Sequence, residues 1–247
     1  MMTTEIRLCV PLTTVGLRRE EDVEDLGGAD VHVSVRMLER GPASIESHVD
    51  EVLAVPDLLR IGMEAQAQGV DAMIVDCMGD PGVEAARELL DIPVFGPAQV
   101  AMHIAGMLGH RFCVVTVLER LHPLIEDLAR RYGVDSIMAR PRSVEIPVLE
   151  IDNDPDQLVG SFIQKAAAAV RDDEVDVIVF GCTGFYGMTE KIEQGLADMG
   201  LAGVPVIDPI PVSVEVVAGL LRQGICHSKH GFQTPPQKDR PGFELGN

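Results

Sequence analysis

Two segments of the chain repeat at a fixed distance, and this repeat constrains the fold more than any other feature. AMIVDCMG at 72–79 and VIVFGCTG at 177–184 each follow a Val-Asp pair, and their Cys and Gly residues recur 105 positions apart. A second pair of similar segments follows, IPVFGP at 92–97 and VPVIDP at 204–209. An in-phase repeat of this kind predicts two lobes of similar design.

Short apolar runs alternate with helix-length segments along the whole chain. Several runs are apolar at consecutive positions, as expected for parallel strands covered on both faces. The expected strands are 6–11, 31–37, 72–76, 93–95, 112–117, 177–181 and 205–207. The expected helices are 46–68, 82–90, 98–109, 119–132, 156–171, 187–199 and 210–223.

This alternation predicts an α/β fold with two pseudo-symmetric lobes, each a mostly parallel sheet flanked by helices. Ligands of such sheets bind where the strands end, so we expect the active site in a cleft between the lobes. The first lobe is predicted to comprise 1–98 plus 208–226, and the second 99–207. Residues 227–247 are predicted to form a polar C-terminal tail without a core of its own.

The composition excludes several classes of partner. The 247 residues include 39 acidic and 20 basic side chains, a net charge of −19 that disfavours nucleic acids and anionic membranes. No apolar run approaches the roughly 20 residues that span a bilayer, and the N-terminus does not read as a signal peptide. Five cysteines without C-x-x-C spacing indicate a reducing, cytoplasmic location. The seven histidines lack the spacing of a metal site, so a small-molecule substrate and no metal are expected.

Two of the cysteines differ from the other three. Cys9, Cys113 and Cys226 fit the ordinary role of a small buried side chain. Cys77 and Cys182 each follow a strand, stand close to a glycine and precede a helix. Unpaired N–H groups at such a turn favour the thiolate, which makes these two thiols candidate catalytic groups.

Two opposed thiols suit the transfer of a proton across a stereocentre. One would act as thiolate base and the other as thiol acid, with the roles exchanged for the opposite enantiomer. The resulting carbanion needs its carbonyl held by N–H donors, which the turns at Gly79 and Gly184 can supply. A phosphatase loop of the C-x5-R kind is excluded, because Val83 and Met188 occupy the arginine position.

At these residues the chain resembles the aspartate/glutamate racemase superfamily, and most closely its hydantoin/allantoin racemase branch. The resemblance covers about 41–229 and rests on GPASIESHVDE, on DCMGDPGVEAARELLDIPVFGPAQVAMHIA, on VVT, on VFGCTGF and on the closing HSK. It implies a racemase of two pseudo-symmetric lobes that needs no cofactor and forms homo-oligomers. It matches Cys77 and Cys182 to the paired catalytic cysteines.

The resemblance also implies substrate-binding residues. The turns after the two cysteines match substrate-cradling loops, and the GPASIES loop matches a segment near the pocket. With the strand ends, they give the candidate binding residues Leu12, Ser44, Met78, Gly79, Thr116, Thr183 and Gly184. Thr183 and Ser44 are equally explained as helix N-caps, and Thr116 as a hydrogen-bonded strand end.

Two departures from the family pattern leave the substrate open. An Asn-Pro-Asn-like stretch after the first strand is replaced by Val10-Pro11-Leu12-Thr13-Thr14, in a loop that lines the pocket in the family. Phe185-Tyr186 adds bulk after the second cysteine, where small residues are common. The expected substrate is a 5-substituted hydantoin or a related ureide.

Three alternatives stay open. An aspartate/glutamate-type amino-acid racemase would need a cationic residue near the substrate, and the candidate loops contain none. A maleate-isomerase-like reaction also uses two cysteines. A non-catalytic two-lobed binding protein is disfavoured by the in-phase thiols.

Overall fold

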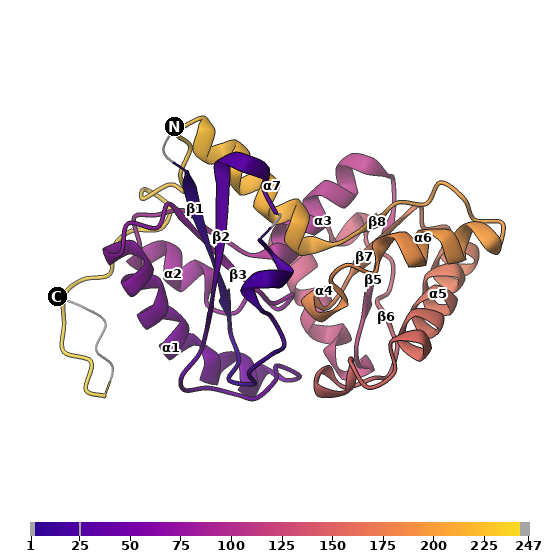
Figure 1. Cartoon of the computed structure of the whole chain (residues 1–247), viewed down its shortest axis with the longest axis horizontal. Coiled ribbons are helices and arrows are strands. Elements are labelled where there is room, and N and C mark those ends of the chain that lie inside the picture. Colours follow the sequence, from indigo (N-terminus) through magenta and orange to yellow (C-terminus); the bar gives the residue numbers. More distant parts are fainter. Residues whose placement is uncertain (1–2, 25, 243–247) are drawn as a thin grey trace. The chain divides into compact units, whose positions relative to one another are not determined.

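The computed structural model describes residues 3–24 and 26–242, which form two compact units. The first unit contains the residues up to Pro97 and those from Ser213 onward, and the second contains Ala98–Val212. The boundaries fall at the start of α3 (Pro97–Leu108) and within the first turns of α7 (Pro209–Arg222). Figure 1 labels the helices and strands.

The first unit is built on a parallel sheet with the strand order β2-β1-β3-β4. Its strands are β1 (Thr4–Val10), β2 (Val31–Met37), β3 (Ala72–Val75) and β4 (Val94–Phe95). Two further helices belong to this unit, α1 (His48–Ala67) and α2 (Val83–Leu89). The chain leaves β1 toward β2 on one side and later returns to add β3 on the other, so the topology switches direction between β1 and β3.

The second unit repeats this topology with the strand order β6-β5-β7-β8. Its strands are β5 (Phe112–Thr116), β6 (Arg142–Ser143), β7 (Val177–Phe180) and β8 (Val206–Ile207). Its further helices are α4 (His122–Tyr132), α5 (Pro155–Asp172) and α6 (Thr189–Asp198). The prediction of an α/β fold with two similar lobes, each with a parallel sheet, is therefore confirmed. The switch in direction here lies between β5 and β7.

Short 3-10 helices complete the secondary structure of the described residues. They span Glu20–Asp22, Gly28–Asp30, Glu119–Leu121, Asp135–Ile137, Val148–Glu150 and Thr183–Phe185. Sequence reasoning missed β6, because a two-residue polar strand has no apolar period to detect. No helix within residues 3–24 and 26–242 is both long enough and apolar enough to cross a membrane.

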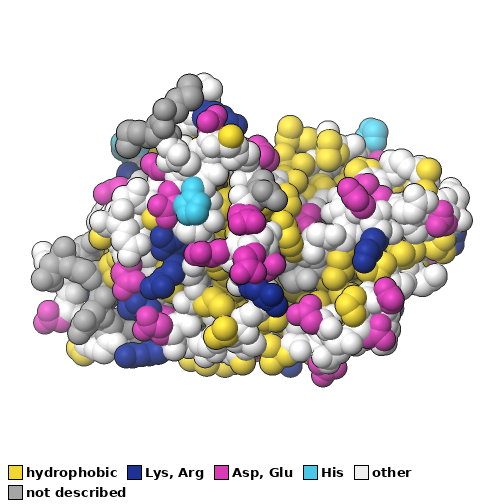
Figure 2. All heavy atoms as spheres, in the orientation of Figure 1, with side chains coloured by type: hydrophobic (Ala, Val, Ile, Leu, Met, Phe, Trp, Pro, Cys, Tyr) yellow, Lys and Arg dark blue, Asp and Glu magenta, His cyan; other side chains and the backbone are white. Residues whose placement is uncertain are grey.

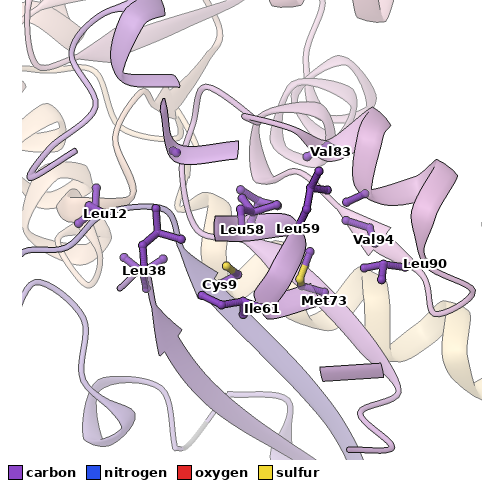
Figure 3. Close-up of a cluster of buried hydrophobic side chains, with 14 of the residues drawn as sticks. Cys9, Leu12, Leu38, Leu58, Leu59, Ile61, Met73, Val83, Leu90 and Val94 are labelled. Atoms are coloured by element: carbon purple, nitrogen blue, oxygen red, sulfur yellow. The ribbon is translucent and has the colours of Figure 1, made fainter. Parts of the chain in front are cut away.

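The cores explain why each sheet holds its central strand firmly. All four residues of β3 and all four of β7 are buried, as the runs of consecutive apolar residues predict. In the first unit, side chains from β1, β3, α1 and α2 form one cluster, with Cys9 and Met73 facing Leu58 and Ile61 (Figure 3). This packing fixes the ends of β1 and β3, where the loops of the candidate site begin.

The segment after α7 continues without regular secondary structure to residue 242, and its first part packs on α2. The Lys229 ammonium donates hydrogen bonds of 2.9–3.1 Å to the carbonyls of Arg87, Glu88 and Leu90 at the end of that helix. The Cys226 thiol donates to the carbonyl of Asp91 at 3.2 Å. Residues 226–229 thus cap α2, the helix that follows the Cys77 turn.

Candidate active site

Each candidate cysteine lies directly after the central strand that borders the change of direction in its own sheet. Cys77 follows β3 by two residues, and Cys182 follows β7 by two residues. At such a point the loops leave in opposite directions and open a crevice at the carboxyl edge of the sheet. The repeat therefore places both thiols at the position of an α/β sheet where ligands usually bind.

The two cysteine turns hold the sulfur atom in the same way. The Gly79 N–H donates to Cys77 Sγ, and the Gly184 N–H donates to Cys182 Sγ, each with a nitrogen–sulfur distance of 3.4 Å. Both thiols are half-buried. A backbone N–H aimed at sulfur stabilises the thiolate form of each cysteine.

The glycines of these turns are required by close contacts. A Cβ at Gly79 would lie 2.3 Å from Glu51 Oε1 and 3.7 Å from Cys77 Sγ. A Cβ at Gly184 would lie 3.0 Å from Ile151 Cδ1 and 3.4 Å from Cys182 Sγ. Any larger residue at Gly79 would push the carboxylate away or shift the turn that presents the sulfur.

Two loops predicted to line the pocket are joined to each other in the first unit. The backbone N–H and the hydroxyl of Thr13 both donate to the Pro42 carbonyl, at 3.0 and 3.2 Å. The Thr14 hydroxyl donates to the Ala43 carbonyl at 2.8 Å. The loop after β1 and the GPASIES loop after β2 therefore form one hydrogen-bonded rim at the carboxyl edge of the sheet.

Leu12 and Ser44 lie in this rim in different environments. Leu12 is buried and its side chain belongs to the hydrophobic cluster of the unit (Figure 3). Ser44 is half-buried and does not cap the following helix. The N-cap of α1 is Ser47, whose hydroxyl accepts from the Asp50 N–H, so the alternative explanation of Ser44 as the cap is wrong. Two serines precede the helix, and Ser47 has the extended backbone of an N-cap, with φ −157° and ψ 162°.

The polar candidates of the second unit also lie at its carboxyl edge. Thr116 ends β5, is fully buried and donates from its hydroxyl to the Gly181 carbonyl at 3.1 Å. This bond ties the start of the Cys182 turn to the neighbouring strand. Thr183 follows the cysteine and is 9% exposed, whereas Met78, at the equivalent place in the first unit, is 5% exposed. The N-cap of the short helix Thr183–Phe185 is Cys182 itself, so Thr183 is not the cap.

A buried ion pair beside Cys77 escaped sequence analysis. Arg18, from the loop after β1, donates from Nε to Asp76 Oδ2 at 2.8 Å and from Nη2 to Oδ1 at 3.4 Å. The two side chains are 5% and 2% exposed. Arg18 lies outside the candidate loops, which contain no Lys or Arg, and its charge is matched by Asp76. No spacing rule links two residues 58 positions apart, so the sequence holds no signal for the pair.

Phe185 has a different role from the one expected. It is fully buried and packs edge-to-face on Phe162 and Phe180, with ring centroids 5.4 and 5.9 Å away. These three rings fill the core of the second unit behind β7. The added bulk of Phe185 therefore supports the Cys182 turn from inside and does not narrow a pocket.

Two of the three cysteines assigned to the core, Cys9 and Cys113, are buried. Burial, helped by the carboxylates of Asp57 and Asp76, raises the pKa of the Cys9 thiol to about 12. Burial also raises the pKa of Cys113 to about 12. Cys226 is exposed, contrary to its expected place in the core, because the segment after α7 runs over the surface.

The surface and the polar clusters bear on possible ligands. Figure 2 shows acidic side chains scattered over one face, with basic side chains in a few places between them. No group of three or more His, Cys, Asp or Glu side chains in the described part of the chain has the arrangement of a metal site. The chemistry available at the two turns is that of thiols and backbone N–H donors.

A sequence profile described as Asp/Glu/Hydantoin racemase matches residues 18–217. The chain belongs to the Asp/Glu/Hydantoin racemase family. It is 33% identical over 241 residues to a hydantoin racemase of Pseudomonas sp. (strain NS671), covering 96% of this chain and 94% of that protein. It is 36% identical to a hydantoin racemase of Rhizobium meliloti, covering 81% of each.

Solved structures agree with this assignment. The allantoin racemase of Pseudomonas fluorescens superposes with a TM-score of 0.89 at 30% identity, covering 97% of this chain and all of that one. The allantoin racemase of Klebsiella pneumoniae gives the same TM-score at 29% identity, covering 98% of each chain. The predictions of a racemase, of the superfamily and of its hydantoin racemase-like branch are confirmed, and the family members act on small molecules.

Proposed function

We propose that this racemase inverts a stereocentre next to a carbonyl without a cofactor, using Cys77 and Cys182 as an acid/base pair. The observation that carries the proposal is the matched geometry of the two turns. In each, a sulfur placed at the change of direction of a parallel sheet accepts the N–H of the glycine two residues on, at 3.4 Å. In a two-base racemisation each group must be able to accept a proton and to give one up, and both turns offer the thiolate the same N–H contact.

In the proposed reaction, one thiolate removes the proton from the stereocentre and becomes a thiol. The electron pair left on carbon is delocalised onto the adjacent carbonyl oxygen, which N–H donors of the turns would stabilise. The other thiol then delivers its proton to the opposite face and becomes a thiolate. One proton has left the substrate and one has entered it. The two cysteines have exchanged their protonation states, so the enzyme is now ready to act on the product enantiomer in the reverse direction.

We propose a 5-substituted hydantoin or a related ureide as the substrate. The relatives named above as hydantoin and allantoin racemases support this class. The charge balance also favours a neutral ring, because Arg18 already faces the carboxylate of Asp76. An aspartate or glutamate substrate would bring carboxylates that need a further cation.

We further propose that the remaining candidates contact this substrate. Gly79 and Gly184 would offer backbone N–H groups close to the reacting centre, because neither residue has a side chain to cover them. Ser44, Thr116 and Thr183 would supply hydroxyl groups, while Leu12 and Met78 would supply apolar contact. These side chains all lie at the carboxyl edges of the two sheets.

The test is deuterium exchange combined with optical rotation. Single enantiomers of several 5-substituted hydantoins, allantoin, aspartate and glutamate are incubated separately with the protein in D₂O. We expect loss of rotation with deuterium at the stereocentre for a hydantoin or ureide, and neither change for the amino acids. If deuterium exchange occurs only with aspartate or glutamate, the proposed substrate class is wrong and the protein is an amino-acid racemase. If the protein instead isomerises maleate, the maleate-isomerase alternative is favoured.

We also propose that the chain forms a homo-oligomer in the cytoplasm. Helix α1 exposes Val49, Val52 and Leu53, a stripe of apolar side chains at helical spacing, with 58–68% of each accessible. The free thiols of Cys9 and Cys113 suit a reducing compartment. Light scattering on the wild type and on Leu53→Glu tests the assembly: a monomeric wild type would refute it, and a smaller variant would place the interface on α1.

A further inference from the structure

We propose that Glu51 makes the two thiols unequal, so that Cys77 rests as the thiol while Cys182 is the first to become thiolate. Glu51 is not a catalytic residue, since it acts on the charge of Cys77 through the turn that it contacts. The role of this asymmetry in catalysis rests on the function proposed above. The asymmetry itself is a property of the folded chain and is measured without substrate.

The observation behind the proposal is the place of the Glu51 carboxylate. It projects from the first turn of α1 onto Gly79, where Oε1 lies 2.3 Å from the position that a Cβ would take. Cys77 Sγ lies 3.7 Å from the same point, so the carboxylate oxygen and the sulfur are at most about 6 Å apart. The Glu51 side chain is only 16% exposed, and Oε1 is sealed from solvent.

The equivalent place in the second unit holds an apolar group. Around Gly184, the atom that approaches the Cβ position is Ile151 Cδ1, at 3.0 Å. The sulfur of Cys182 lies 3.4 Å from that position. The hydrogen bond from the Gly184 N–H to this sulfur has the same length as the one from the Gly79 N–H to Cys77 Sγ. The two turns thus share the glycine N–H contact to sulfur, but a carboxylate approaches the glycine of the first turn and an apolar side chain approaches that of the second.

A carboxylate beside a sulfur opposes a second negative charge, and poor access of water strengthens the effect. Two more carboxylates, those of Asp76 and Asp80, belong to the same turn. Asp76, its chain neighbour, is matched by Arg18, and Asp80 lies against Gly96 at the end of β4. His48 Nδ1 lies 3.3 Å from Glu51 Oε2, but its side chain is 69% exposed, so water screens its charge.

This asymmetry gives a racemase a defined resting state. A pair of equal thiols would be doubly protonated or doubly ionised over much of its titration, and neither state can catalyse. Holding one thiol protonated while the other ionises widens the pH range of the active, singly ionised form. The loss of activity at high pH would then report ionisation of Cys77.

The experiment measures alkylation of each cysteine by iodoacetamide as a function of pH, with the modified peptides quantified by mass spectrometry. In the wild type we expect Cys182 to react at lower pH than Cys77. In Glu51→Gln, which keeps the shape of the side chain, we expect the Cys77 profile to move down by about one pH unit. At a pH below the midpoint of the Cys77 profile, that shift makes alkylation of Cys77 about tenfold faster. The Cys182 profile should stay in place and report an intact fold.

Glu64→Gln is the matched control, because it removes the same charge from the far end of α1, where Glu64 pairs with Arg60. It should move neither profile. The proposal is overturned if the wild-type Cys77 reacts at lower pH than Cys182. It is also overturned if Glu51→Gln leaves Cys77 unmoved or shifts both cysteines equally.

A second readout links the asymmetry to catalysis. In Glu51→Gln we expect the alkaline limb of kcat/KM against pH to move down by about one unit, with the acidic limb unchanged. If no substrate exchanges in D₂O but the alkylation shift is found, the proposed function fails and the role of Glu51 stands. If exchange occurs without the alkylation shift, the proposed function stands and the role of Glu51 is refuted.

Discussion

The turns around Cys77 and Cys182 share the glycine N–H that contacts the sulfur and differ in the side chains around it. The residue before the cysteine is Asp76 in the first unit, buried against Arg18, and Gly181 in the second, packed on Thr116. A Cβ at Gly181 would approach the Cα and Cβ of Thr116 to 2.8 and 2.7 Å, so the second turn has no room for a carboxylate there. The repeat has therefore kept the position of the sulfur and changed the charges around it.

In each unit a carboxylate also lies between the cysteine turn and the end of the last strand, supplied by the turn in the first unit and by the strand end in the second. In the first unit, Asp80 projects from the turn onto Gly96, where a Cβ would lie 2.2 Å from its Cγ. In the second unit, Asp208 projects from the end of β8 and accepts the Gly187 N–H at 2.9 Å. A carboxylate thus occupies this place in both units, although the element that supplies it differs. The geometry at the sulfur is what the two units preserve.

The largest expected effect tests whether both sulfurs are needed. Cys77→Ser and Cys182→Ser should each lower kcat for racemisation by about 10²–10⁴-fold, because each removes one acid/base group. Optical rotation of a racemising substrate measures the loss. Cys226→Ser, at an exposed cysteine outside both turns, should keep full activity. Full activity in either of the first two variants would break the two-thiol mechanism.

The next effect tests the ion pair between Arg18 and Asp76 beside the first turn. Arg18→Met leaves the buried carboxylate of Asp76 without its cation and should lower the free energy of unfolding by about 3–5 kcal/mol. Urea denaturation measures the change. Arg142→Met is the control at a partly exposed pair with Asp173, where at most about 1 kcal/mol is expected. Adding Asp76→Asn to Arg18→Met should recover part of the loss, and a loss no larger than that of the control would contradict the prediction.

A smaller effect compares the helices that follow the two turns. Lys229→Met removes three hydrogen bonds to the last carbonyls of α2 and should cost about 1–2 kcal/mol, because water can replace part of them. Hydrogen exchange should show faster opening of α2 and unchanged protection of α6. Lys238→Met, in the irregular segment beyond, should change neither. Equal loss of protection in both helices would mean that the Lys229 hydrogen bonds stabilise the whole chain and not α2 in particular.

The smallest effect concerns one histidine in each unit. Burial lowers the pKa of His122, at the start of α4, and of His227, after α7, below the ordinary value of 6.5. Because the unfolded chain binds these protons more readily, their contribution to stability is present above pH 6.5 and is lost as the pH falls below it. Unfolding free energies at pH 7.5 and 5.5 should differ less in His122→Asn and in His227→Asn than in the wild type. An unchanged difference would show that these side chains are not buried as neutral groups.

The sequence predicted the strands and the place of the cysteines because both depend on local pattern. β3 and β7 are short runs of buried apolar residues, and the in-phase Cys and Gly residues mark the turns that follow them. The start of α1 does not follow from local pattern, since Ser44 and Ser47 both precede it and the folded backbone selects Ser47 as the N-cap. β6 was missed because its pairing with β5 comes from tertiary contact.

The side chains that distinguish the two turns could not be predicted. Glu51 lies within a segment that resembles the family, yet its contact with Gly79 depends on how α1 packs on the sheet. The role of Phe185 was misread because bulk beside a cysteine can face a pocket or a core, and only packing decides which. By itself, the sequence determined the fold class, the repeat and the position of both thiols, since apolar periodicity and turn residues act over a few neighbours. The tertiary structure alone decided which charges surround each thiol, because electrostatic contacts join residues that are distant in the chain.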